Sequence, residues 1–171
     1  MIVSGSIPMT ERGLRQLQDE LKNLTFVERP QVIAEIAKAR SYGDLSENAE
    51  YAAAKERQNL VERRIRYIEE RISRAQVVDL RMLSGNKVFF GAHVLLEEGE
   101  GEREVEYQIV GADEANIQEG RLSIEAPLAK ALIGKEVGDF ITLTIAQKKK
   151  EFLIKSVKYI SDVDSCVNPS L

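Results

Sequence analysis

Apolar residues recur at spacings of three and four in two separate stretches of the first half of the chain. The first stretch comprises Leu14, Leu17, Leu21, Leu24, Val32, Ile33, Ile36 and Ala37. The second comprises Val61, Ile65, Ile68, Ile72 and Ala75. Because this spacing brings apolar side chains to one side of a helix, each stretch predicts a long helix with a heptad seam. Two such helices joined by a short turn form an antiparallel coiled-coil hairpin, a rod on the order of 45 Å long.

Local signals indicate where the two helices begin and end. Thr10 is suited to cap the first helix, and Gly43 can end it in the left-handed conformation. Pro30 either kinks this helix or begins a fresh helical segment. The second helix is expected to begin around Asp44 to Glu47. The residues expected on the seam near the turn are all small: Ala49, Ala52 and Ala53. They predict that the rod is slender at this end.

The second half of the chain has a different pattern, in which glycines separate short apolar runs. Eight of the eleven glycines follow residue 80, and such runs favour strands and turns. The strand candidates are Lys87–Leu96, Glu104–Val110, Leu122–Ile124, Phe140–Ile145 and Phe152–Tyr159. Pro127–Ile133 is a candidate for a short helix. The expected fold class is α+β, with a coiled-coil hairpin in residues 1–79, a β-sheet domain in 80–160 and a mobile tail in 161–171.

The charge of the chain divides along the same line. There are 24 basic and 28 acidic side chains, a formal net charge of −4. The first 80 residues sum to zero, so the whole acidic excess lies in the second half. This average argues against simple electrostatic binding to nucleic acid. The acidic run Glu97–Glu106 and the basic run Lys148–Lys150 are expected to be exposed hairpin turns.

Cysteine and histidine are scarce. The chain has one of each, Cys166 and His93, which excludes an internal disulfide framework and argues against a zinc site. His93 is expected to be an ordinary strand residue. No apolar run reaches the roughly 18–20 residues of a membrane span, and the first ten residues lack the features of a secretory signal. We therefore expect a cytoplasmic protein that does not bind a membrane.

Two acidic residues, Asp44 and Glu47, lie three positions apart where the hairpin turns. This spacing is typical of a capping box, in which each side chain accepts a hydrogen bond from a free backbone N–H at a helix start. Two carboxylates at the end of a rod also offer oxygen ligands to a hard cation such as Mg²⁺. Because Mg²⁺ takes six oxygen ligands, the second interpretation requires another molecule to supply the others. The spacing alone leaves both interpretations open.

Short blocks spread over residues 7–160 carry a family resemblance. They are Ile7–Thr10, Arg29–Pro30, Gly43–Tyr51, Val88–Ala92, Tyr107–Gly111, Asp113–Ala115 and Ala131–Lys135. In this order the blocks resemble the Gre family of bacterial transcript-cleavage factors. The resemblance implies an N-terminal coiled coil and a C-terminal domain of FKBP-like fold. Two features depart from the family pattern: Ala126, where Ser is common, and the extension after Tyr159.

The resemblance implies an accessory factor of bacterial RNA polymerase rather than an enzyme. The sheet domain would dock at the rim of the polymerase secondary channel, and the hairpin would reach through the channel toward the active site. There it would stimulate cleavage of the nascent RNA 3′ end in backtracked complexes. Asp44 and Glu47 would help hold a second Mg²⁺ beside the carboxylates of the polymerase. The free protein would bind no cofactor stably, and we expect it to be a monomer.

The same resemblance gives roles to three further residues of the block Gly43–Tyr51. By position in the block, Leu45, Asn48 and Tyr51 are expected to position the tip. For Tyr51 the alternative is that its ring packs over the end of the hairpin. For Leu45 the alternative is that it closes the turn.

Basic residues lie on both arms behind the turn. Arg40 and Lys55 flank the tip and are expected to contact phosphates of the extruded RNA. The alternative is a solvated helix face, or pairing with nearby glutamates, which contributes little. A further set, Arg57, Arg64 and Arg71, repeats every seven residues. This repeat is expected to be an ordinary solvated face.

Two other functions compete with this interpretation. A Gre-like inhibitor would occupy the same channel without stimulating cleavage, but the acids of the tip are in place. A peptidyl-prolyl isomerase would need an aromatic-lined pocket, whereas the chain has no Trp, five Tyr and five Phe, and fold alone does not give function. Within the family, the neutral first 80 residues and Leu45 indicate the less basic of its two subfamilies.

Overall fold

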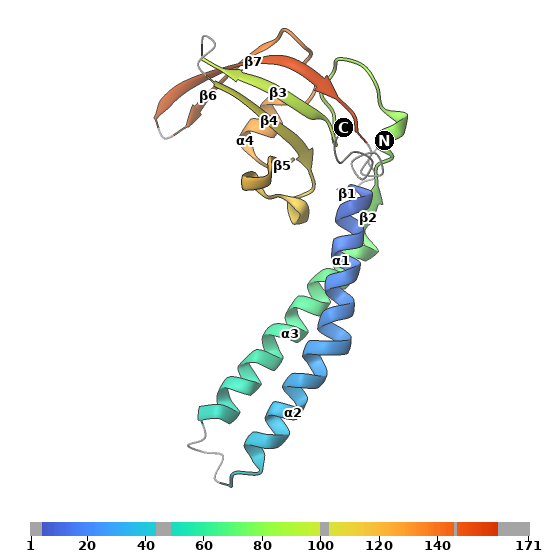
Figure 1. Cartoon of the computed structure of the whole chain (residues 1–171), viewed down its shortest axis with the longest axis vertical. Helices are drawn as coiled ribbons and strands as arrows, with labels where there is room; N and C mark the ends of the chain where they lie inside the picture. Colours follow the sequence, from blue (N-terminus) through green and yellow to red (C-terminus); the bar gives the residue numbers. More distant parts are fainter. Residues whose placement is uncertain (1–4, 44–48, 100–102, 146, 161–171) are drawn as a thin grey trace, which may run out of the picture. The chain divides into compact units, whose positions relative to one another are not determined.

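The computed structural model describes residues 5–43, 49–99, 103–145 and 147–160. The chain forms two compact units, Leu14–Ala75 and Met1–Gly13 together with Gln76–Leu171 (Figure 1). The first thirteen residues therefore group with the second half of the chain, whereas the predicted segment 1–79 includes them in the hairpin. Every described helix is too short or too polar to cross a bilayer.

The helical unit contains the predicted antiparallel hairpin. Its described elements are α1 (Glu11–Asn23), the π-helical turn η1 (Leu24–Glu28), α2 (Arg29–Arg40) and α3 (Ala49–Ser73). Ion pairs join α2 and α3 in opposite order along the two helices: Arg29 with Glu62, and Glu35 with Arg57. This order confirms that the two arms run antiparallel.

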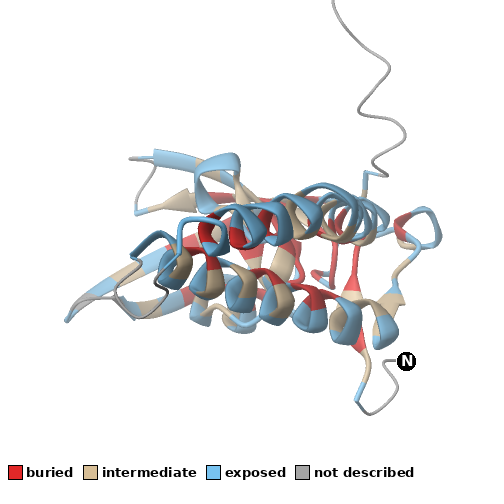
Figure 2. Cartoon of the chain, turned by 90° about the horizontal axis from the view of Figure 1, so that it is seen from below, coloured by how far each residue is buried: buried red, intermediate tan, exposed pale blue. Residues whose placement is uncertain are grey.

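An apolar seam holds the arms together (Figure 2). Its buried members are Leu17, Leu24, Val32, Ile36 and Ala39 on the first arm, and Ala54, Val61, Ile65 and Ile68 on the second. On the second arm the predicted heptad is confirmed, and Ile72 is partly buried. Ala75 is an exception, because α3 ends at Ser73 and Ala75 begins strand β2 (Ala75–Val77).

In the first arm, the π-helical turn lies directly before Pro30. Arg29 donates its N–H to the carbonyl of Leu24, five residues back. Pro30 then falls in the first turn of α2, where a missing N–H costs little. The wider turn accommodates one extra residue, so the buried positions Leu24 and Val32 are eight apart instead of seven.

This extra residue changes which side chains reach the seam. Without it the heptad phase would bring Gln31 and Lys38 inward. With it, the seam continues through Val32, Ile36 and Ala39. The prediction was wrong for Ile33, which is 52% exposed, and for Ala37, which is exposed, because each lies one residue after a seam position and therefore about 100° further around the helix.

Toward the turn the buried side chains of the seam become small, although they belong to other residues than predicted. The predicted small residues Ala49, Ala52 and Ala53 are exposed. The buried small residues are Ala39 on α2 and Ala54 on α3. Ala54 lies seven positions before Val61, so the heptad count on the second arm leads to it directly.

The second unit is built on a five-stranded sheet with the strand order β5-β4-β3-β7-β6. The strands are β3 (His93–Glu98), β4 (Arg103–Val110), β5 (Arg121–Ser123), β6 (Phe140–Ile145) and β7 (Lys148–Lys158). Only the β4–β5 pair is parallel among these. Helix α4 (Pro127–Leu132) buries Ala129 and Leu132 in the core with alternate residues of β3 and β4. The unit also holds β1 (Ile7–Met9), which pairs with β2 and was not predicted.

One predicted strand and two predicted turns of this unit differ from the structure. The candidate Lys87–Leu96 becomes a strand only at His93, because Gly91 takes a positive φ of 82° and turns the chain. Of the acidic run, Glu97 and Glu98 belong to β3 and Arg103 to Glu106 belong to β4, whereas residues 100–102 lie outside the described residues. The basic run Lys148–Lys150 opens β7. Lys150 and Lys155 form ion pairs with Glu98 and Glu97 of the neighbouring strand β3.

A buried carboxylate fixes the start of α1 within this unit. Glu114, which is 4% exposed, accepts hydrogen bonds from the backbone N–H of Thr10 (2.9 Å), the hydroxyl of Thr10 and the backbone N–H of Gly111 (3.3 Å). The hydroxyl of Thr10 in turn accepts from the N–H of Gly13 at 3.0 Å. This contact confirms Thr10 as the N-cap, and the negative charge of Glu114 lies at the positive end of the helix.

Gly13→Ala is expected to lower the free energy of unfolding. An alanine for a glycine inside a helix ordinarily stabilises by about 0.4–1 kcal/mol. Here the added Cβ would lie 2.1 Å from Cδ of the buried Glu114, so we expect a loss of about 1–3 kcal/mol. Urea unfolding followed by circular dichroism measures the sign. The control is the same change in a Glu114→Ala background, where most of the loss should vanish; an equal loss in both backgrounds would contradict the assigned cause.

Ala126→Ser is expected to raise the free energy of unfolding of the sheet unit. Ala126 is the N-cap of α4, has an extended backbone and makes no side-chain capping hydrogen bond. A serine hydroxyl there can accept from a free N–H of the first turn, a gain of about 0.5–2 kcal/mol. Thermal unfolding measures it, with Ala131→Ser inside the same helix as the control. A gain in the control but none at position 126 would contradict the capping argument.

Candidate functional site

The candidate site is the end of the hairpin, between α2 and α3. Helix α2 ends at Arg40, and the hydroxyl of Ser41 donates to the carbonyl of Lys38 at 2.6 Å. Gly43 follows with a φ of 101°, the left-handed conformation predicted for it. Helix α3 then begins at Ala49. Of the predicted site residues, Asp44, Leu45, Glu47 and Asn48 lie outside the described residues, so their roles stay predictions.

The other three predicted residues lie together. The guanidinium of Arg40 lies over the ring of Tyr51, 5.8 Å from its centroid, and so joins the last residue of α2 to the first turn of α3. A hydrogen bond from Arg40 and the positive charges of Arg40 and Lys55 hold the pKa of the Tyr51 phenol below its ordinary value. The amine of Lys55 donates to Oε1 of Gln58 at 2.9 Å.

These contacts bear on the alternatives for each residue. Tyr51 is half-buried and its ring packs against Arg40 across the hairpin, which is compatible with packing over the hairpin end and with positioning the tip. Arg40 is exposed and Lys55 is partly exposed. Their contacts with Tyr51 and Gln58 leave positive charge at this end of the rod, where no acidic partner neutralises it in the contacts described here.

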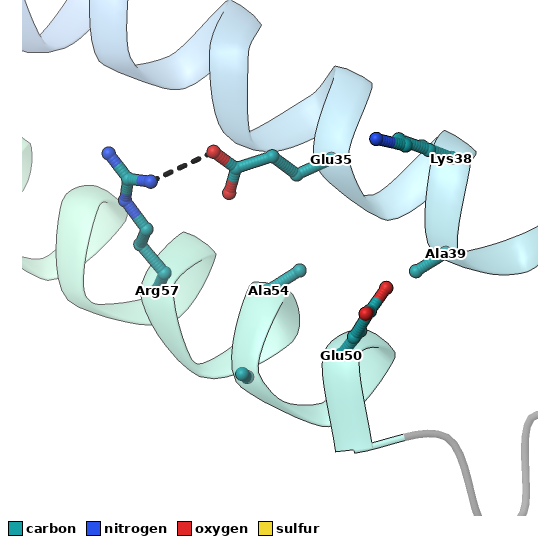
Figure 3. A pocket seen from close by; sticks show the side chains of 7 residues that line it. Glu35, Lys38, Ala39, Glu50, Ala54 and Arg57 are labelled. Atoms are coloured by element: carbon teal, nitrogen blue, oxygen red, sulfur yellow. Dashed lines mark hydrogen bonds and ion pairs between the residues drawn. The ribbon is translucent and has the colours of Figure 1, made fainter.

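A groove of about 380 Å³ lies between the two arms behind this cluster. Figure 3 shows Ala39 and Ala54 on facing sides of it, with Glu35 and Lys38 on α2 and Glu50 and Arg57 on α3. The guanidinium of Arg57 is 2.9 Å from Oε1 of Glu35. This groove was not predicted from the sequence. The heptad spacing of the second arm places Ala54 on the seam, and this spacing could have predicted the groove.

The arginines that repeat every seven residues belong to the framework of the hairpin. Arg57 pairs with Glu35, and Arg64 makes two hydrogen bonds with Glu20, at 2.6 and 2.8 Å. The guanidinium groups of Arg64 and Arg71 lie over the ring of Tyr67. These residues thus link the two arms or brace one of them, which is more than the solvated face that was predicted.

The described residues contain no group of three His, Cys, Asp or Glu side chains placed to hold a metal ion. His93 is the first residue of β3, as predicted, with its Nδ1 3.7 Å from Oε1 of Glu106. Cys166 lies outside the described residues.

Comparisons with known proteins agree over most of the chain. Residues 7–77 match the family model "Transcription elongation factor, N-terminal", and residues 83–159 match "Transcription elongation factor, GreA/GreB, C-term". Transcription elongation factor GreA of Phenylobacterium zucineum is 51% identical over 154 residues, which is 90% of this chain and 98% of that protein. GreA of Anaeromyxobacter sp. is 46% identical over 156 residues, 91% of this chain and 94% of that protein.

A solved structure with a similar chain is GreA factor homolog 1 of Thermus thermophilus. It is 25% identical and has a TM-score of 0.42 over 90% of this chain and 99% of that chain. The two family models together span most of the sequence, and the relatives named above are GreA factors, in agreement with the predicted less basic subfamily. This chain belongs to the GreA/GreB family of transcription elongation factors.

Proposed function

We propose that this chain binds RNA polymerase and stimulates the cleavage of the RNA 3′ end by the polymerase in backtracked, arrested complexes. It acts as an accessory factor and supplies no complete active site of its own. One observation carries the proposal: the antiparallel arms bring Arg40, Tyr51 and Lys55 together at the end of the hairpin. Asp44 and Glu47 lie in the sequence between Gly43 and Ala49, the residues where the two arms end and begin.

The shape of the hairpin near this end suits entry into a channel. The seam there is built from the small side chains of Ala39 and Ala54, which face the groove between the arms. Ion pairs of Glu35 with Arg57 and of Arg29 with Glu62 fix the register of the arms. A rod of fixed register holds the groups at its end in place, as chemistry that depends on positioning requires. The sheet unit, which carries the acidic excess, would dock at the rim of the polymerase secondary channel.

The two acids fit a hard cation. Asp44 and Glu47 are carboxylates, the oxygen donors that Mg²⁺ prefers, and they supply only part of its six ligands. The polymerase would provide the others, so the free protein is expected to bind Mg²⁺ only weakly. A second Mg²⁺ held in this way would supply the charge stabilisation that phosphodiester hydrolysis needs. Arg40 and Lys55 would hold the extruded RNA by its phosphates.

Asp44→Asn is expected to abolish stimulated cleavage while the fold is kept. Asparagine caps a helix about as well as aspartate, but it lacks the charge that a cation needs. We expect the cleavage rate in backtracked complexes to fall on the order of 100-fold, measured as shortening of labelled transcripts at saturating factor. Asp19→Asn, an exposed acid on α1, is the matched control and should keep full activity. If Asp44→Asn cleaved at the original rate, the metal role of Asp44 would be wrong.

The inhibitory alternative gives a different outcome in the same experiment. An inhibitor would bind the polymerase, compete with an active factor and leave the transcripts uncut whether or not Asp44 is changed. Cleavage of naked RNA by the free protein would contradict both functions.

Lys55→Gln tests the contact with RNA. If Lys55 holds a phosphate, its loss should lower the slope of affinity against salt by about 0.7–0.9. The measurement is the concentration of factor that gives half-maximal cleavage, followed from low to moderate salt. Lys22→Gln, an exposed lysine on α1, is the control for general loss of charge. An unchanged slope in Lys55→Gln would show that Lys55 does not hold RNA.

A further inference from the structure

The sheet unit contains a polar pocket that the proposed function does not use. Its volume is about 400 Å³, within the range of small-molecule sites. Arg12 of α1, His93 of β3, Glu106 and Gln108 of β4, and Glu119 and Arg121 after it contribute to its lining. None of these residues belongs to the block Gly43–Tyr51, and all lie in the unit that holds the sheet.

The strand geometry explains why polar residues gather here. Along β4, Ile109 points into the core with helix α4, so Glu106 and Gln108 point to the opposite face of the sheet. Gln108 is nevertheless only 8% exposed. It lies directly opposite Arg121 in the parallel pair of β4 and β5, and the side chain of Arg121 is only 12% exposed.

Two hydrogen-bond donors of residues that line this pocket lack acceptors among the described residues. Nε2 of Gln108 and Nε of Arg121 are fully buried, and no acceptor among the described residues reaches either atom. The other end of the guanidinium is engaged, since Nη2 of Arg121 donates to Glu119 at 2.7 Å. Buried donors are nearly always paired in folded proteins, with protein, water or a ligand.

We propose that this pocket binds a small molecule through a carboxylate group. Neighbouring amide and guanidinium donors on register-paired residues suit the two oxygens of a carboxylate. Arg12 adds positive charge at the rim. Glu106 and Glu119 also line the pocket, and their charges disfavour a phosphate dianion more than a carboxylate monoanion. Binding requires small rotations of the Gln108 amide and of the Arg121 side chain, because Nε2 and Nε are both covered.

A competing arrangement needs no ligand. If the amide of Gln108 were turned by half a turn about its last bond, its oxygen would take the place of the buried nitrogen. In this arrangement Nε of Arg121 donates to that oxygen. The pocket would then have no unmet donor, and a carboxylate would not bind there.

Nuclear magnetic resonance of the full chain distinguishes carboxylate binding from the arrangement with the rotated Gln108 amide. Sodium acetate is titrated against sodium chloride at constant ionic strength, and the side-chain N–H signals of Gln108 and Arg121 are followed. We expect saturable shifts of both, and at least a tenfold loss of acetate affinity in Gln108→Met, a change of similar volume. Gln18→Met, on the exposed surface of α1, is the matched control and should leave the affinity unchanged.

Three results would overturn the proposal. They are shifts that do not saturate, phosphate binding more tightly than acetate, and a hydrogen bond from Nε of Arg121 to the amide oxygen of Gln108 in the acetate-free protein. The last of these is read from the unmodified chain, so the test holds even if Gln108→Met fails to fold.

Discussion

The candidate site depends on one constraint, the phase of the apolar seam between the two arms. On the second arm the heptad runs without interruption from Ala54 to Ile68. On the first arm it would bring Gln31 and Lys38 inward beyond Leu24, and burial of such polar side chains is costly. The π-helical turn η1 removes this conflict by taking up one residue. Only in the shifted phase do Ala39 and Ala54 face one another, with Arg40 beside Tyr51.

Charge is used differently in the two units. In the sheet unit, the acidic and basic runs that look like exposed turns in the sequence lie on neighbouring strands, and Glu97 and Glu98 pair with Lys155 and Lys150. In the hairpin, most of the described arginine contacts join or brace the arms. The basic groups of Arg40 and Lys55 are arranged otherwise, around Tyr51 and Gln58. A net charge of −4 for the whole chain therefore says little about the charge that a partner would meet at the end of the hairpin.

The features predicted best from the sequence are those that depend on the regular spacing of apolar residues. Val61, Ile65 and Ile68 follow from spacing alone, as does Thr10 as a cap from its place before the first helix. The prediction failed where a contact with a distant part of the chain determines the local structure. Nothing near Glu114 in the sequence indicates that it meets Thr10, which is 104 positions away. The π-helical turn was missed because a proline predicts an interruption without saying how many residues it takes up.

The blocks that carry the family resemblance gain meaning once their contacts are known. Ile7–Thr10 meets Tyr107–Gly111 and Asp113–Ala115 through the carboxylate of Glu114. Val88–Ala92 meets Ala131–Lys135, because the N–H of Val88 donates to Lys135 and the N–H of Gly134 donates to Val88, both at 2.8 Å. These blocks are explained by folding.

The block Gly43–Tyr51 is different. Its described members Gly43, Ala49 and Glu50 are exposed, and Tyr51 is half-buried. They contribute no buried apolar residue to the seam, whose last members toward this end are Ala39 and Ala54. Described residues of a family block that are exposed and that the core does not require are better explained by what they contact outside the chain. The physical case for function is therefore strongest at this end of the hairpin, where packing explains the residues least.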